Sequence, residues 1–546
     1  MEASSTNINL KRNLVCSLIP AFFIALFLEV GYFTKHEQGM HFTFLRVLFL
    51  LMLVLILTVG IFFLFKGVDK LNKRPAKLSF FNKKFKNSFL FAVVCMALLF
   101  ICWVPCFLAF YPGLFAYDAQ WQYFMYVNGE ISEHHPVLHT YMLGFTVSKV
   151  YALTGSINKG IAAYTVFQEL LMLFGCGYVF NLLHRRKVRT SLYIFTFIFF
   201  AFFPTIVIFV FTSIKDSIFA VALAGFLLLN LFLYEDPVSF FKKKSNIVMW
   251  VILALAVCIF RNNAIYAVIP TLPFFLIFIL KNRKTMIKSL IMLFVTAVIF
   301  IIYKYPVTNA LTTAGTYASE KLSVPCQQIK RVYAYHYDEL SGSEKSEEER
   351  YFDNELTYNY YVPEIADAAK GCLRNDVYEA DTEGFWNLWH QLFKEYPYEY
   401  INSFLENTYG FYYPWPKYVL YQFGGEAYTN MHILEPGVEN SKLPKLLSLL
   451  RNFEDGDIVM SDTWISWLFA PATYMYLALL VGFYLLRNKE YSKTISVLFT
   501  ALFWCTFLLG PVAMPRYALY LFFLVPVWGA YVFENTKDCL ASPDGV

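Results

Sequence analysis

Residues 88–110 read SFLFAVVCMALLFICWVPCFLAF, an apolar run without a charged side chain. A helix needs about 20 mostly apolar residues to cross the hydrocarbon of a bilayer, because unpaired backbone polar groups cannot be hydrated there. This run is long enough, and it lacks the alternation of apolar and polar residues that a barrel strand requires. We therefore expect an all-α protein that crosses a membrane.

Comparable runs recur toward both ends of the chain. The stretch 247–280 is too long for one helix and is interrupted by Arg261-Asn262-Asn263, so we expect two short helices there. Segment 137–153 is short and contains polar residues; we expect it to be re-entrant or interfacial, and the alternative is that it also crosses. The sequence predicts about 12 transmembrane helices, at 14–34, 41–65, 88–110, 161–183, 192–211, 217–234, 247–260, 264–280, 289–306, 465–486, 494–512 and 517–533.

The composition agrees with lipid as the main solvent. Apolar and aromatic residues make up 58% of the 546 residues, whereas charged residues make up 16%, below the roughly 25% of soluble domains. This balance excludes a soluble globular enzyme, a disordered chain and a small disulfide scaffold.

Basic loops predict the orientation. Cytoplasmic loops carry an excess of Lys and Arg, and the basic segments share one side if both termini are cytoplasmic: 66–87, 184–189, 242–244, 281–288 and 487–493. The expected location is a bacterial-type plasma membrane, crossed several times. The predicted parts are a transmembrane module at 1–306 with a first large outer loop at 111–136, an extracytoplasmic domain at 307–464, and C-terminal helices with a short cytoplasmic tail at 465–546.

The predicted domain at 307–464 is acidic, rich in aromatic residues and without a long apolar run. We expect it to be mixed or mainly α. Residues 386–405 have the spacing of an amphipathic helix interrupted at Pro397, and 338–356 is acidic enough to be a solvated loop. Cys326 and Cys372 are its two cysteines, and the sequence leaves open whether they form a disulfide. Tyr409–Pro416 either stacks on sugars or lies at the lipid headgroups.

The outer loop holds the first candidate site residues. Asp118 follows closely on an outgoing helix, in Tyr117-Asp118-Ala119-Gln120, and its carboxylate either accepts a proton from a hydroxyl, binds a divalent metal or simply caps a helix. His134 and His135 close the loop and either line a catalytic cleft or anchor the helix that follows Pro136.

Further ionisable residues lie in short turns on the same predicted side. Lys215 suits a phosphate oxygen, and Asp216 suits the first turn of the next helix. Adjacent residues do not share a helical face, so we expect different partners for these two. Arg261 suits bidentate phosphate binding or a pair with Asp216, and Arg516 suits the same cluster or the lipid interface. Charges at a membrane face are expensive unless they pair or function, and this gathering suits a reaction on a membrane-anchored phosphate.

These motifs resemble the GT-C superfamily of membrane glycosyltransferases. Tyr117-Asp118 matches the functional Asp or Glu that the first large external loop of that superfamily carries soon after a transmembrane helix. His134-His135-Pro136-Val137-Leu138 is similar to the loop-closing segment of the protein-mannosyltransferase and aminoarabinose-transferase branches. Uncharacterised bacterial multi-pass proteins look closer still, at Lys215-Asp216, Arg261-Asn262-Asn263 and Tyr413-Pro414-Trp415-Pro416. The chain departs from the superfamily at Ala119-Gln120, where many members have a second acid, and in carrying its domain before the last three helices.

The resemblance implies an inverting glycosyltransferase that moves a sugar from a polyprenyl-phosphate donor to an envelope glycan, lipid or protein. Asp118 would be the base or a ligand of a divalent metal ion; Lys215, Arg261 and Arg516 would hold the phosphate; and His134, His135 and Asp216 would line the cleft. The alternatives are a transporter or flippase of a lipid-linked saccharide and a non-catalytic envelope-assembly protein. Nucleic-acid binding is not expected, because topology already explains the basic loops.

Overall fold

The computed structural model describes residues 2–36, 43–73, 79–353, 361–416, 441–454 and 464–533. Within these ranges the chain is helical, and β-structure is limited to isolated bridges. Seven helices are long and apolar enough to cross a membrane, and the bent pair α8–α9 makes up to eight. The expected all-α membrane architecture is confirmed at this level.

The candidate spans account for the first six predicted segments and two later ones. They are α1 (Glu2–Lys35), α2 (Phe44–Lys73), α4 (Ser88–Phe110), α7 (Ile157–Arg186), α10 (Lys215–Glu235), α13 (Ile265–Lys281) with the 3-10 turn Asn262–Ala264, and α14 (Met286–Ile302), which continues to Leu311. The bent pair is α8 (Thr190–Phe202) and α9 (Pro204–Phe211), which meet at 52°. Proline at the first position of α9 cannot continue the hydrogen bonding of α8, which explains the bend.

The remaining predicted segments fall on shorter helices. These are α12 (Lys244–Phe260), α26 (Pro471–Arg487), α27 (Tyr491–Phe507), α28 (Pro515–Phe523) and α29 (Val525–Val532). The predicted start at 465 is too early, because α25 (Trp464–Trp467) is a separate turn and α26 begins only at Pro471. The other short helices are α3 (Phe80–Lys84), α11 (Pro237–Lys242), α15 (Thr308–Leu311) and α23 (Pro444–Glu454).

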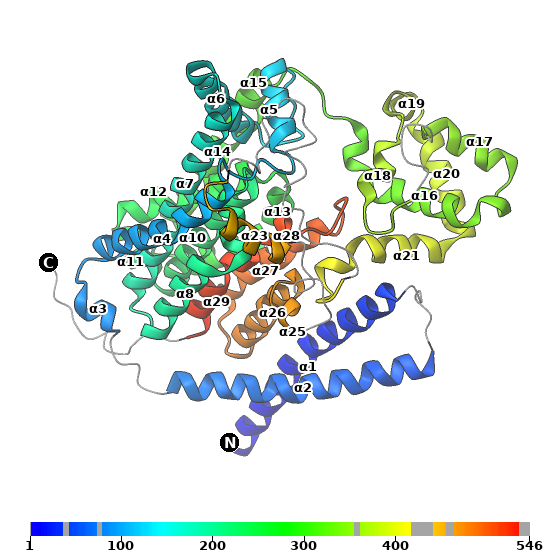
Figure 1. Ribbon diagram of the computed structural model, residues 1–546. Helices are drawn as coiled ribbons and strands as arrows, with labels where there is room; N and C mark the ends of the chain where they lie inside the picture. Colours follow the sequence, from blue (N-terminus) through cyan, green and yellow to red (C-terminus); the bar gives the residue numbers. More distant parts are fainter. Residues whose placement is uncertain are drawn as a thin grey trace.

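Segment 137–153 forms most of α6 (Val137–Thr154), which is not among the candidate spans. Gly155, at a φ of 66°, turns the chain from α6 into α7, and the Ser156 side chain accepts from the Lys159 amide to start that helix. α5 (Ala119–Asn128) packs on α6, and Figure 1 shows both at one end of the bundle.

The described part of residues 307–464, which we call the insert, has a hydrophobic core of its own. This core is separate from that of the bundle formed by the candidate spans and the C-terminal helices. It is built from α16 (Ser323–His336), α17 (Gly342–Tyr351), α18 (Ala366–Gly371), α19 (Asn375–Ala380), α20 (Thr382–Glu395) and α21 (Pro397–Thr408), which lie to one side in Figure 1. The predicted amphipathic helix with a break at Pro397 is confirmed. Cys326 and Cys372 are both buried in this core as thiols and are not joined in a disulfide.

One prediction for the insert is wrong. The acidic segment 338–356 is not a solvated loop throughout, because Gly342–Tyr351 is helical. Ser341 and Glu344 form a reciprocal capping box that satisfies the first amides of this helix. Residues 354–356 lie outside the described residues.

The aromatic stretch after α21 is buried rather than displayed. Tyr412 lies against the ring of Phe27 of α1, with ring centroids 5.3 Å apart, and its carbonyl accepts from the Tyr476 hydroxyl of α26. Gly31 of α1 allows this packing, because a Cβ at that position would lie 2.3 Å from Tyr413 Cβ. The stretch therefore joins the insert to the bundle.

Candidate functional site

A backbone bridge brings the outer loop to the N-terminus of α10. The Leu114 amide donates to the Phe211 carbonyl at 2.8 Å, and the Ser213 amide donates to the Leu114 carbonyl at 2.9 Å. α10 begins two residues after Ser213, at Lys215. The bridge thereby places the segment leading to Asp118 beside Lys215, although the two residues are far apart in sequence.

Asp118 occupies the N-cap position of α5, yet its side chain makes no capping hydrogen bond. Tyr117, just before it, has a φ of 54°, a left-handed conformation that costs energy for a residue with a side chain. Such strained residues tend to cluster at functional sites. The capping role allowed by the sequence is therefore not what the Asp118 carboxylate does.

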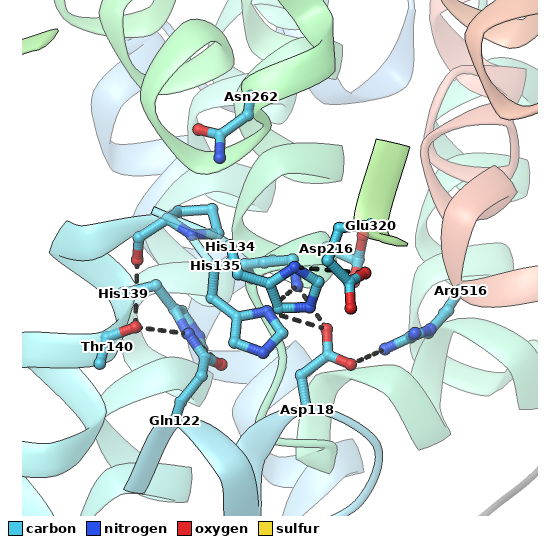
Figure 2. Close-up of polar contacts among 12 residues, drawn as sticks. Asp118, Gln122, His134, His135, His139, Thr140, Asp216, Asn262, Glu320 and Arg516 are labelled. Atoms are coloured by element: carbon cyan, nitrogen blue, oxygen red, sulfur yellow. Dashed lines mark hydrogen bonds and ion pairs between the residues drawn. The ribbon is translucent and has the colours of Figure 1, made fainter. Parts of the chain in front are cut away.

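The Asp118 carboxylate lies between two cations and a histidine (Figure 2). Its Oδ2 accepts from Lys215 Nζ and lies 3.7 Å from His135 Nδ1, and its Oδ1 lies 2.9 Å from Arg516 Nη1. Lys215 Nζ is also 3.4 Å from His135 Nδ1. The Lys215 and Arg516 side chains are 9% and 8% exposed, so these charges interact with little screening by water.

These surroundings fix the protonation of the loop residues. Burial opposes ionisation of Asp118, but the charges of Arg516 and Lys215 outweigh it and hold its pKa well below the ordinary value. Burial, reinforced by the charge of Lys215, lowers the pKa of His135 well below its ordinary value. At neutral pH the site therefore contains an ionised Asp118 and a neutral His135.

A second ion pair adjoins the first. Arg261, in the break between α12 and α13, places Nη2 2.9 Å from Asp216 Oδ1. The Tyr517 ring lies between the two guanidinium groups, 5.1 Å from that of Arg261 and 4.6 Å from that of Arg516. Lys215 and Asp216 thus have different partners, as expected for neighbours on a helix.

Asp118, Lys215, Asp216, Arg261 and Arg516 together form a charged cluster. It has an unbalanced positive charge and polar atoms that make no hydrogen bond. Three cations and two carboxylates leave one positive charge, because the pKa of the neighbouring His135 is lowered. Among the residues that the structure describes, Asp216 Oδ2 and the Nε atoms of Arg261 and Arg516 make no hydrogen bond, although all three atoms are buried. Buried polar groups without partners are rare in native proteins and call for an explanation.

His134 does not belong to this cluster, although its ring packs edge-on against that of His135. Its Nδ1 lies 3.5 Å from Glu320 Oε2, at the start of the insert, and Glu320 also accepts from Lys370 of α18 at 2.6 Å. The same side of the insert reaches the turn before Arg516: the Ala366 amide donates to the Pro511 carbonyl at 2.6 Å, and Ile365 bridges Val512. The insert therefore touches both edges of the cluster.

The residues around Asp118 do not fit a divalent metal ion. Both carboxylate oxygens face cations, which would repel a metal. Across the described ranges, no group of three or more His, Cys, Asp or Glu side chains is arranged to hold one. Asp118 is therefore better explained as a charged partner than as a ligand.

Behind the site, a buried hydrogen-bonded chain joins α5 to α6 (Figure 2). Gln122 donates its amide to Thr140 Oγ1 at 3.0 Å, which turns its Oε1 toward His139 Nδ1 at 3.1 Å. His139 Nε2 in turn accepts from the Tyr164 hydroxyl at 2.7 Å. Gln122 is four residues after Asp118 and His139 is four residues after His135, so this chain links the two helices that follow the site residues.

An apolar cavity of about 830 Å³ opens beside the cluster. His135 belongs to both, and Glu133, Asn262 and Lys304 add polar groups at the same end of the cavity. The rest of the wall is mostly apolar, with a few hydroxyl groups, and comes mainly from α13 and α14. A charged cluster thus adjoins a space suited to a hydrocarbon chain.

Sequence reasoning missed the residues that support the site. Tyr517 was adjacent to a candidate, Arg516, and that adjacency was the available signal. Gln122 and His139 carried no signal beyond being polar in apolar surroundings, and Glu320 could not be linked to His134 without the fold.

Comparison with known proteins assigns most of the chain to a sequence family. The sequence model of a family described as "Family of unknown function (DUF6020)" matches residues 127–542. No curated protein and no solved structure shows a significant match to the chain.

Proposed function

The chain belongs to this family of unknown function, and from the geometry of its site we propose that it is an integral-membrane glycosyltransferase using a polyprenyl-phosphate-linked sugar. The observation that carries the proposal is the ion-paired cluster of Asp118 with the buried Lys215 and Arg516, next to an apolar cavity that the neighbouring His135 lines. The GT-C superfamily, which the motifs resemble, provides the closest chemical precedent.

The charge of the cluster suits a phosphodiester, which carries one negative charge. Lys215 and the two arginines supply donors, and the Nε atoms of Arg261 and Arg516 have no partner among the described residues. Cations placed where negative charge develops stabilise a departing phosphate. His135 is neutral at this point, so it can donate or accept a hydrogen bond without adding charge.

Asp118 is the base in this proposal. The acceptor hydroxyl oxygen attacks the anomeric carbon, the bond from that carbon to the phosphate oxygen breaks, polyprenyl phosphate leaves with the electron pair, and the hydroxyl proton passes to Asp118. A base works best when its pKa lies near the operating pH. A bound phosphate adds negative charge beside Lys215 and Arg516 and so raises the depressed pKa of Asp118, which makes the base effective when the donor is present.

The topology that supports this chemistry has about twelve crossings with both termini cytoplasmic. α6 then lies outside the hydrocarbon together with α5. Two crossings, α4 and α7, then separate the basic segments 66–87 and 184–189, so both segments lie on the cytoplasmic side. Residues 307–464 are extracytoplasmic, and the cluster lies at the outer membrane face. The membrane is a bacterial-type plasma membrane, and the acceptor is a glycan, lipid or protein of the envelope that the insert guides.

The test is sugar transfer by the purified protein from a panel of polyprenyl-phosphate sugars, with released polyprenyl phosphate and glycosylated product both measured. Asp118→Asn should abolish product formation. Asp69→Asn, which removes the carboxylate paired with Arg487 elsewhere in the bundle, is the matched control and should retain activity. Wild-type protein that moves a lipid-linked saccharide across sealed vesicles without forming product would overturn the proposal in favour of transport.

A further inference from the structure

The apolar cavity continues deeper into the bundle. A second cavity of about 140 Å³ adjoins it, and the walls of both include Cys258 of α12, Val268 and Leu272 of α13, and Leu293 and Thr296 of α14. Along α13 the lining residues Ile265, Val268, Leu272 and Phe275 recur at helical spacing, so they lie on one face. The two cavities therefore follow one face of α13 and share part of their walls, and together we call them the apolar path.

The path is longer than one leaflet. From Asn262 at the polar end to Phe275 at the far end, the chain rises about 20 Å at helical rise per residue. The hydrocarbon of a typical bilayer is about 30 Å thick, so one leaflet contributes about 15 Å. A ligand that fills the path must therefore extend past the middle of the membrane.

Aromatic side chains close the far end. The ring of Trp250 is stacked on that of Phe275 with centroids 6.1 Å apart, and Tyr234 lies 6.4 Å from Phe275. Trp250 is held in place because its Nε1 donates to Asn230 Oδ1 at 2.7 Å. The path thus ends on a fixed aromatic floor.

Resting on the glycosyltransferase function proposed above, we propose that this path selects the donor by the length of its isoprenoid chain. It accepts one hydrocarbon chain attached to a phosphate at the charged cluster, which suits a single-chain polyprenyl phosphate better than a two-chain phospholipid. A chain confined to one leaflet leaves the aromatic floor uncovered, whereas a longer chain reaches it. Lipid tails outside the protein are as apolar as the path, so selection depends on packing inside it.

The experiment narrows the path at Thr296, where the two cavities meet. Thr296→Trp should block the inner cavity, and Val295→Trp is the matched control because Val295 is 40% exposed on the outer face of the same helix. Farnesyl phosphate and undecaprenyl phosphate are the probes, and the affinity of each is compared between variant and wild type, which cancels differences in membrane partitioning. The cost of overpacking predicts about tenfold weaker binding of undecaprenyl phosphate to Thr296→Trp than to wild type. The affinity of Thr296→Trp for farnesyl phosphate, and the affinity of Val295→Trp for both lipids, should equal those of wild type.

A second measurement needs no variant. Undecaprenyl phosphate with a photoreactive group at its far end should label wild-type protein around Trp250 and Phe275, and the same group on farnesyl phosphate should not. Equal losses for both probes in Thr296→Trp, or labelling at the floor by both, would overturn the length selection. The proposed glycosyltransferase function would survive that result, and it fails separately if no sugar is transferred while the binding pattern holds.

Discussion

Replacing Asp118 by Asn tests the central ion pairs, because it removes the negative charge and keeps the shape. Lys215 and Arg516 then remain as buried cations that face an uncharged amide. Removing one partner of a buried pair typically costs about 3–5 kcal/mol, since the stranded charge has lost both its partner and water. We expect Asp118→Asn to lower the free energy of unfolding in detergent by this amount.

The double variant Asp118→Asn with Lys215→Met separates the stranded charge from other effects. It removes one of the two unpaired cations, so it should lose less stability than the two single variants would in sum. Groups in direct contact usually show coupling of about 0.5–3 kcal/mol in such a cycle. The cycle is measured by chemical unfolding of the four proteins, followed by tryptophan fluorescence.

Activity is measured on the folded fraction of each protein, so that loss of stability is not mistaken for loss of chemistry. A positioned general base typically contributes about 10²–10⁴-fold to rate. Sugar transfer per folded Asp118→Asn molecule should fall by this factor, and the double variant should not recover it. Additive stability losses, or transfer within about tenfold of wild type, would refute the assignment of Asp118 as a base held by Lys215.

Three further outcomes follow from the same geometry. Arg516→Gln removes a positive charge that lowers the pKa of Asp118, so this pKa should rise. On acidification, activity should then be lost at a higher pH than in wild type, and an unchanged acid limb of the pH–activity profile would contradict this. His139→Leu should lower kcat with little change in KM, whereas His139→Gln, which keeps a donor and an acceptor, should restore most of it; equal losses would indicate a purely structural role. Alkylation after unfolding, with mass spectrometry, should modify both Cys326 and Cys372, and a recovered peptide in which a disulfide links them would contradict this expectation.

The helices were the part that the sequence could predict best. Long apolar runs without charge have few alternatives in lipid, and the interruption at Arg261 indicated the break between α12 and α13 correctly. Net charge alone predicts a loop over 338–356, whereas the Ser341–Glu344 capping box, whose Ser-x-x-Glu spacing stands in the sequence, stabilises the helix Gly342–Tyr351.

The candidate site could be predicted as a set of residues but not as an arrangement. Predicted topology placed Asp118, Lys215 and Arg261 on one side of the membrane, and the predicted alternative partner of Arg261, Asp216, is the observed one. Asp118 pairs with both Lys215 and Arg516 because the bridge between Leu114 and Thr212 positions the outer loop. This bridge is made by backbone atoms, so the side chains in the sequence do not predict it. The apolar cavity depends on how α12, α13 and α14 pack against one another, which the sequence does not predict either.

The short bridge between Ile365 and Val512 makes the insert a lever on the bundle. Val512 is four residues before Arg516, so a change in the position of the insert would reach the guanidinium that faces Asp118 through a short length of backbone. Binding of a bulky molecule to the insert could then change the position of Arg516 relative to the Asp118 carboxylate, although that molecule would not contact either charge.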